Sequence, residues 1–147
     1  LCAGGEEAGL RGTKAFLKAN KDALKADGVE TVFFTIDTIR ELDFPQIYDK
    51  DMTGMVKSDL RVAKLIQTAA KNVGLDVPIG PISLGATDSA AASQAGFPAS
   101  SFVAMDPAPA RYYHTRLDTA DNLSAQAIDT TVKLALETVF LYDEQGI

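Results

Sequence analysis

The sequence predicts an α/β domain in which helices cover both faces of a mixed, mostly parallel sheet. Segments with helical periodicity alternate with short apolar runs along the chain, as in layered α/β folds. The clearest run, TVFFTI at residues 31–36, is rich in apolar and β-branched side chains, which is typical of a strand covered on both faces. The length of 147 residues, 46% of them apolar, suffices for one core, and no linker or repeat divides residues 1–147. We therefore expect a single domain.

The composition argues against two classes of protein. The net charge is −6 and the pI about 4.7, whereas a nucleic-acid-binding surface needs clustered positive charge to contact phosphates. No apolar run approaches the roughly 20 residues that a membrane-spanning helix needs. The single cysteine, Cys2, cannot form an internal disulfide, and we expect it to pack within a strand.

The first third of the chain is predicted to be strand, helix and strand. Residues 1–3 (LCA) have the pattern of the end of a buried strand. Residues 10–24 have apolar side chains on one side of a helix and charged side chains on the other, and Gly28 ends that segment. The strand at residues 31–36 follows, with Asp37 directly after it.

The middle of the chain is predicted to alternate between turns and regular elements. Residues 40–55 are rich in turn formers and contain a short strand candidate at residues 46–48. Ser58 is a suitable N-cap for a helix that runs to about Val73 and is ended by Gly74. Residues 77–84 form one weak strand candidate, because two prolines interrupt it.

The last part of the chain is predicted to contain two helices, a strand and a long loop. Residues 86–95 form a short, alanine-rich helix, and residues 100–104 a strand. Residues 106–123 have few regular signals, and a long loop of this kind in a compact domain is often functional. Residues 124–142 form the last helix. The residues of this helix that we expect to face inward are Ile128, Val132, Ala135 and Val139.

Four polar residues are candidates for a metal site. Glu6 and Glu7 lie at a strand-to-helix junction and Asp37 ends a strand, and the carboxyl ends of strands are where sites form in open α/β sheets. His114, the only histidine, lies in the long loop, and carboxylate with imidazole ligands suits zinc. Each residue also has a plain alternative, such as an acidic first helical turn, a strand-end cap or a surface histidine.

Four stretches taken together resemble the M28 family of zinc peptidases over essentially the whole chain. They are GGEEAGLRGTKAF, FFTIDTI, LGATDSAAASQAGFPA and YYHTRLDTADNL, in this order. The resemblance implies a three-layer, zinc-exopeptidase-like fold that holds two zinc ions. It assigns Glu6 as the base that acts on the metal-held water and Glu7 as a metal ligand. It also makes Asp37 a ligand of the other metal ion and His114 a further ligand.

Three more residues acquire possible roles by this resemblance. Asp88 would orient a ligand or the substrate, although Ser89 follows it where many relatives have histidine. The alternative for Asp88 is a helix N-cap. Tyr113 would shape the substrate pocket or hold an oxyanion, with core packing as its alternative, and Asp118 would form a hydrogen bond near His114. An acidic group at Asp43, Asp49 and Asp51 lacks the ligand register of a calcium loop.

The family pattern also has a histidine and a bridging aspartate before the GEE motif. We therefore expect residues 1–147 to be the C-terminal portion of a longer catalytic domain, which lacks its N-terminal part. This portion alone is expected to bind zinc weakly and to be inactive.

The function that follows is a zinc aminopeptidase that releases N-terminal amino acids from peptides. Glutaminyl cyclisation is an alternative, but the chain has no tryptophan and only 7% aromatic residues, whereas cyclase pockets are usually tryptophan-lined. An inactive, peptidase-like binding module is another, and the presence of Glu6, Asp37 and His114 disfavours it. Residue specificity, oligomeric state and cellular location stay open, although relatives are often exported.

Overall fold

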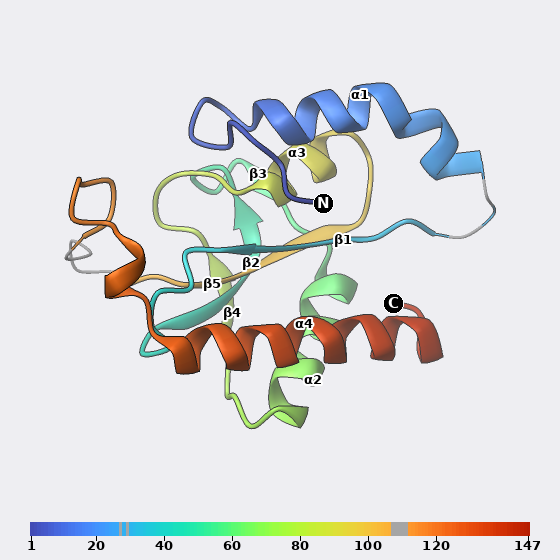
Figure 1. Cartoon of the computed structure of the whole chain (residues 1–147). Coiled ribbons are helices and arrows are strands. Elements are labelled where there is room, and N and C mark those ends of the chain that lie inside the picture. The colour runs from blue at the N-terminus through green and yellow to red at the C-terminus, as the bar shows by residue number, and fades with distance from the viewer. Residues whose placement is uncertain (27, 29, 107–111) are drawn as a thin grey trace.

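The computed structural model describes residues 1–26, 28, 30–106 and 112–147, which form a sheet with helices on both sides (Figure 1). The elements are α1 (Arg11–Ala26), β1 (Phe33–Asp37), β2 (Pro45–Asp51), β3 (Val56–Lys57), α2 (Leu60–Asn72), β4 (Ile79–Pro81), α3 (Asp88–Gln94), β5 (Ala99–Ala104), the 3-10 helix η1 (Ala120–Asn122) and α4 (Ala125–Gln145).

The sheet is mixed and open, as the sequence predicts. The strand order is β1-β5-β2-β3, with β4 alongside β2. In the described residues, β1 is parallel to β5 and β4 to β2, whereas β2 is antiparallel to both β5 and β3. Helices α1 and α3 lie on one face of the sheet, and α2 and α4 lie on the other, so the domain has three layers (Figure 1).

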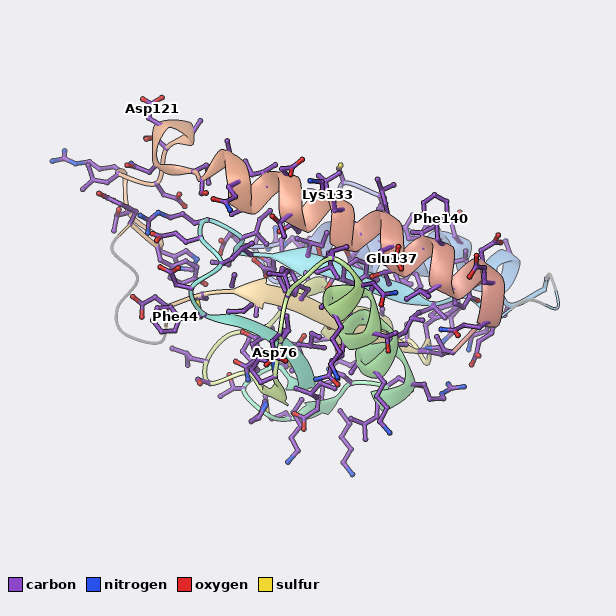
Figure 2. All side chains as sticks on the ribbon, turned by 90° about the horizontal axis from the view of Figure 1, so that it is seen from below. Phe44, Asp76, Asp121, Lys133, Glu137 and Phe140 are labelled. Atoms are coloured by element: carbon purple, nitrogen blue, oxygen red, sulfur yellow. The ribbon has the colours of Figure 1, made fainter. Side chains whose placement is uncertain are left out.

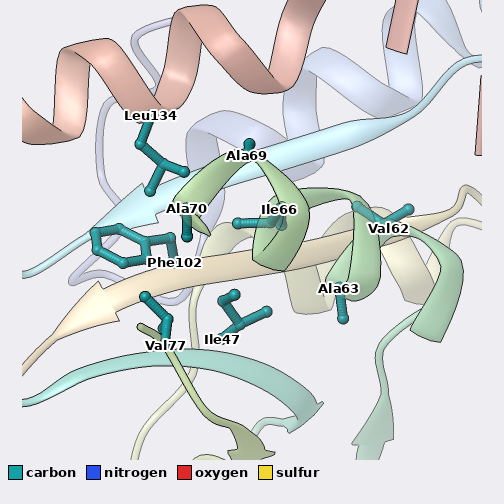
Figure 3. Close-up of a cluster of buried hydrophobic side chains, with 9 residues drawn as sticks. All are labelled: Ile47, Val62, Ala63, Ile66, Ala69, Ala70, Val77, Phe102 and Leu134. Atoms are coloured by element: carbon teal, nitrogen blue, oxygen red, sulfur yellow. The ribbon is translucent and has the colours of Figure 1, made fainter. Parts of the chain in front are cut away.

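The main hydrophobic core lies between the sheet and the α2–α4 layer (Figure 3). Ile47 of β2 and Phe102 of β5 are fully buried there, against Ile66 of α2 and Leu134 of α4. Neighbouring strand residues point to opposite faces, so Phe34 packs on this core while Phe33 packs on the smaller core under α1 and α3. Strand β1 is therefore apolar on both sides.

The helix starts differ from the expectation at two positions. Asp59, not Ser58, is the N-cap of α2, because its carboxylate accepts a hydrogen bond from the Arg61 N–H at 2.8 Å. The Ser58 hydroxyl is instead buried without a hydrogen-bond partner in the described residues. Thr87, not Asp88, is the N-cap of α3, so Asp88 lies in the first helical turn.

The strand expected at residues 1–3 is wrong. These residues have no regular structure, Leu1 is 80% exposed, and Cys2 is exposed rather than packed. An isolated segment forms a strand only when a neighbouring strand satisfies its backbone groups, and here no described ladder contains these residues. By contrast, the short strand expected at residues 46–48 is present and longer than expected. It is part of β2, which pairs with β4 on one side and with β5 on the other.

The inward face expected for the last helix is also wrong. The buried residues of α4 are Ala127, Thr131, Leu134 and Thr138. Val132 and Val139 are 52% and 60% exposed, and Ile128 is exposed as well. The helix has two apolar stripes, and only one of them packs on α2 and the sheet. No helix of the described residues is long and apolar enough to cross a membrane.

Candidate functional site

The GGEE segment forms a tight turn that brings two acids to the start of α1. The Gly5 carbonyl accepts hydrogen bonds from the Ala8 and Arg11 N–H groups, and the Glu6 carbonyl accepts from Leu10 at 2.8 Å. Gly5 has φ +68°, a backbone conformation that glycine adopts without strain. The turn packs closely on the helix, because a Cβ atom at Gly12 would lie 2.2 Å from the Gly4 carbonyl oxygen.

Asp37 lies at the carboxyl end of β1, next to this turn. It pairs in register with Val103 of the parallel strand β5. The Thr38 hydroxyl donates to Asp37 Oδ1 at 2.8 Å, and the Thr38 carbonyl accepts from the Ala104 N–H at 2.9 Å. These contacts fix the aspartate where the two parallel strands end, at the edge of the sheet where α/β sites form.

His114 and Glu7 meet although 107 residues separate them. His114 Nε2 lies 3.0 Å from Glu7 Oε1. The His114 ring stacks on the Tyr113 ring, with 3.9 Å between ring centroids and 16° between ring planes. The segment that carries Tyr113 and His114 therefore lies against the GGEE turn and brings an imidazole to the acids.

The acids of the site lie close enough together to raise the pKa of two of them, Glu6 and Asp37. The pKa of Glu6 is raised to about 7, first by partial burial and then by the negative charges of Asp37, Glu7 and Asp88, while His114 opposes the shift. Burial also raises the pKa of Asp37, and the nearby Glu7 and Asp88 add to this, whereas the hydrogen bond from Thr38 opposes it. These two pKa shifts show that the structure gathers four carboxylates with little positive charge.

Tyr113 belongs to the same cluster. Its pKa is raised by burial and then by the charges of Asp37, Glu7 and Glu6, which places its hydroxyl in the field of these acids. Tyr113 is 40% exposed and its ring is stacked on His114, so it lines the site rather than the core.

A cavity of about 460 Å³ opens beside these residues. Its lining includes Glu7, Asp37, Tyr113, His114 and Asp118, together with the apolar side chains of Ile39, Phe44 and Leu123. Glu6 and Asp88 are not part of this lining. The cavity is therefore large enough for an amino-acid side chain, and its lining combines acidic and apolar side chains.

Arg40 fixes the loop that carries His114. Its guanidinium lies over the Tyr112 ring, 4.6 Å from the centroid, and its Nε donates to the Asn122 carbonyl at 3.1 Å. The loop after β1 thus holds both ends of the described segment between residues 112 and 122. This contact was not anticipated from the sequence, which gave Arg40 no distinguishing neighbours.

The donor set fits a divalent cation in its chemistry but is incomplete. Carboxylate oxygens and an imidazole nitrogen are ligands that zinc accepts. The raised pKa of Asp37 and the buried Asp88 Oδ1, which has no hydrogen-bond partner in the described residues, indicate a place where positive charge is favoured. In the described part of the chain, however, no group of three or more potential ligands lies close enough together to hold an ion.

A buried network of hydroxyl groups, which was not predicted from the sequence, includes the two residues on either side of Asp88 in the chain. The Asp51 carboxylate is fully buried and accepts hydrogen bonds from the Thr87 N–H at 3.0 Å and from the Ser89 hydroxyl at 2.8 Å. The Ser101 hydroxyl contacts Ser89 at 2.7 Å and Thr35 at 2.6 Å, which links the network to β1. Asp51 is thus a structural acceptor rather than part of a calcium loop. Small hydroxyl residues flanking Asp88 were the available signal.

The chain matches a known protein family. The family model for peptidase family M28 matches residues 1–139. A comparison with curated protein sequences gives no match.

Solved structures share the fold. An aminopeptidase from Aneurinibacillus sp. strain AM-1 is 25% identical with a TM-score of 0.71, and the match covers 94% of this chain and 31% of that one. A zinc aminopeptidase from Bacillus subtilis is 22% identical with a TM-score of 0.74, over 97% of this chain and 34% of that one. A glutaminyl cyclase from an Acidobacteriales bacterium is 24% identical with a TM-score of 0.70, over 93% of this chain and 47% of that one. The chain thus spans about a third of the aminopeptidases, and it belongs to peptidase family M28.

Proposed function

We propose that the complete protein is a zinc-dependent aminopeptidase that releases the N-terminal residue of peptides. The observation that carries the proposal is the distance of 3.0 Å between His114 Nε2 and Glu7 Oε1. The neighbouring acid Glu6 has a raised pKa, which fits a role in proton transfer. Membership of peptidase family M28 supports a peptidase, and the aminopeptidase neighbours support the exopeptidase type.

Glu7 and His114 are the residues that would hold one zinc ion, and Asp37 would serve a second. Bound zinc lowers the pKa of a coordinated water to about 7 and polarises a carbonyl group. The remaining donors would come from outside the described residues, because these residues do not complete a ligand set.

Glu6 is the proposed general base and acid. Its carboxylate would take a proton from the attacking water and return it to the leaving amine. Without metal, burial and the neighbouring acids raise its pKa to about 7, which suits a group that both accepts and donates a proton. Glu6 is suited to this role because it lies close to Glu7 and Asp37, yet its carboxylate accepts no hydrogen bond from the described residues.

The cavity is the proposed place for the substrate's first residue. Its acidic side chains, among them Glu7, Asp37 and Asp118, would favour the positively charged amino terminus of a peptide. Tyr113 would hold the scissile carbonyl's developing negative charge by donating its hydroxyl hydrogen, because its raised pKa keeps the hydroxyl protonated.

Turnover of aminoacyl chromogenic substrates by the complete protein, with and without a chelator, tests the proposal. Chelation is expected to abolish turnover. Replacing Glu6→Gln is expected to lower kcat at least 100-fold and to leave zinc content unchanged, because Glu6 moves protons but is not a ligand. The matched control is Glu144→Gln, an exposed acid on α4, which should change neither. Equal turnover by the Glu6→Gln variant would refute the assignment of the base.

Glutaminyl cyclisation is the second candidate, because the cyclase neighbour matches over 93% of this chain with a TM-score of 0.70. The same assay with glutaminyl peptides distinguishes it. Loss of ammonia without release of an amino acid would favour cyclisation, and no turnover of either substrate would favour a binding module.

A further inference from the structure

The carboxylate of Asp51 lies on the α3 side of the sheet because a bulge redirects the side chains of β2. The pairing of β2 with β4 shifts register between Tyr48 and Lys50. Without this shift, Asp51 would point to the same face as Ile47, which packs on the α2–α4 core. Instead it is fully buried against Thr87 at the start of α3, which lies on the opposite face (Figure 1). Bulges beside active sites commonly redirect a side chain in this way.

The hydrogen bonds around this carboxylate have a fixed direction, because a carboxylate only accepts. Asp51 Oδ2 accepts from the hydroxyls of Thr87 at 2.5 Å and Ser89 at 2.8 Å, which uses the single hydrogen of each. Ser101 therefore donates towards these two hydroxyls, and it has no hydrogen left for Thr35. Thr35 must then donate to Ser101, at 2.6 Å. The chain of hydrogen bonds runs in one direction, from Thr35 on β1 to Asp51 on β2.

This chain of hydrogen bonds joins the segments that carry Asp37 and Asp88. Thr35 and Asp37 are two residues apart on β1, so they point to the same face of the sheet. Thr87 and Ser89 flank Asp88 in the sequence. Asp88 and Thr35 also line one cavity, and the charge of Asp88 contributes to the raised pKa of Asp37. The network therefore connects the end of β1 with the first turn of α3.

Apolar packing alone does not fix α3 in one position on the sheet. The helix has only seven residues, and its buried apolar side chains, Ala90, Ala91 and Ala92, are small. Apolar contacts are non-directional, whereas hydrogen bonds fix both the position and the rotation of the groups that they join. Burying a carboxylate is costly, and replacing all partners of a buried polar network by apolar groups is often neutral or stabilising. What the network positions is therefore a better explanation for it than stability.

We propose that Asp51 is a positioning residue of the site, which acts through Thr87 and Ser89 to hold the Asp88 carboxylate beside the end of β1. The Asp88 Oδ1 atom is buried and accepts no hydrogen bond from the described residues, so it is free to accept one from an N–H group of the substrate or of a metal-binding side chain. The effect on turnover rests on the proposed function, whereas the effect on the position of α3 does not.

Kinetics of the complete protein on aminoacyl chromogenic substrates test whether Asp51 acts through Asp88. Asp88→Asn and Asp51→Asn should each lower kcat/KM about 10-fold, the latter because its amide nitrogen would face hydroxyls that donate. The double variant should lie within about 2-fold of Asp51→Asn, because residues that act as one unit are not additive. A purely structural Asp51 would give the full product of the two effects, which would overturn the proposal. Wild-type kinetics of Asp88→Asn would overturn it as well.

Variants of Thr35 make the test independent of whether Asp51→Asn folds. Thr35→Val removes only the first hydrogen bond of the chain, so it should lower kcat/KM in the wild-type background but not in the Asp88→Asn background. Thr35→Ser retains the hydroxyl and should behave as wild type in both. Equal kinetics of Thr35→Val and Thr35→Ser would contradict the proposal.

Amide hydrogen exchange in the complete protein tests the position of α3 without any activity. The N–H groups of Thr87 and Ser89 donate to Asp51 and to the Thr87 hydroxyl, and they should exchange about 10-fold faster in Thr35→Val than in wild type. Thr68→Val, which removes an exposed hydroxyl on α2, is the matched control and should leave them unchanged. Unchanged exchange in Thr35→Val would overturn the proposal. Faster exchange in a protein that turns over no substrate would refute the proposed function and support the positioning of α3.

Discussion

At the scale of single residues, Glu6 makes stability depend on pH. Its pKa is 4.5 in the unfolded reference and about 7 in the folded protein, so the folded state binds more protons between these values. Without metal, the free energy of unfolding therefore falls as pH rises from about 4.5 to 7. Glu6→Gln should make this fall smaller, which urea denaturation across that pH range would measure. An unchanged slope in the variant would show that Glu6 titrates normally.

Asp51 is predicted to be the most sensitive buried acid. Asp51→Ala removes the acceptor of the Thr87 N–H and of the Ser89 hydroxyl, and unsatisfied buried donors are costly, so it should lower the free energy of unfolding by about 3 kcal/mol. Asp76→Ala, on an exposed loop residue (Figure 2), should change it by less than about 0.5 kcal/mol. Chemical denaturation measures both. Similar small effects would mean that the network does not contribute to stability.

The residues of the site were identified from motifs rather than from physical pattern. Glu7 and His114 are far apart in the sequence, and only the resemblance joined them before the structure brought them to 3.0 Å. The structural roles of Asp51 and Arg40 were not anticipated, because they depend on side chains that reach these residues from other elements. Long-range contacts of this kind leave no local periodicity.

At the scale of elements, the start of α2 gives a direct test of capping. Asp59→Ala should destabilise the protein by about 1 kcal/mol, because the Arg61 N–H loses its acceptor. Ser58→Ala should be neutral or slightly stabilising, since it removes a buried hydroxyl that has no partner in the described residues. Thermal unfolding of the two variants distinguishes the two caps. A larger loss for Ser58→Ala would contradict the assignment.

Helices were predicted more accurately than strands and packing faces. The 3.6-residue period of α1 and α2 is strong, and both helices lie within two residues or so of the expected bounds. Strand β2 was underestimated because Asp49 and Asp51 resemble turn residues, although Asp51 is buried by tertiary contacts. The predicted inward face of α4 was wrong because the helix has two apolar stripes, and periodicity alone does not show which of them is buried.

At the scale of the whole molecule, the α/β layers follow from the sequence but the edge of the sheet does not. Alternating elements predict three layers, and α1 and α3 indeed cover one face while α2 and α4 cover the other (Figure 1). The position of β1 at the edge depends on strand order, which hydrophobic pattern does not encode. The strand expected at residues 1–3 is absent from the described sheet, because no described strand pairs with these residues.

The 147-residue chain alone is predicted to bind zinc weakly. Its described residues offer Glu7 and His114 as a pair, without a third ligand nearby, and structural or catalytic zinc usually needs at least three protein ligands. Calorimetric titration with zinc should give a dissociation constant above the micromolar range. Sub-micromolar binding would show that the 147 residues contain a complete site.

The most direct test of the central claim, that Glu7 and His114 hold zinc beside a base that is not a ligand, is calorimetric zinc titration of the complete protein. Wild type and Glu6→Gln should bind zinc equally, whereas His114→Ala should bind at least 10-fold more weakly. Equal zinc affinity of His114→Ala and wild type would contradict the claim.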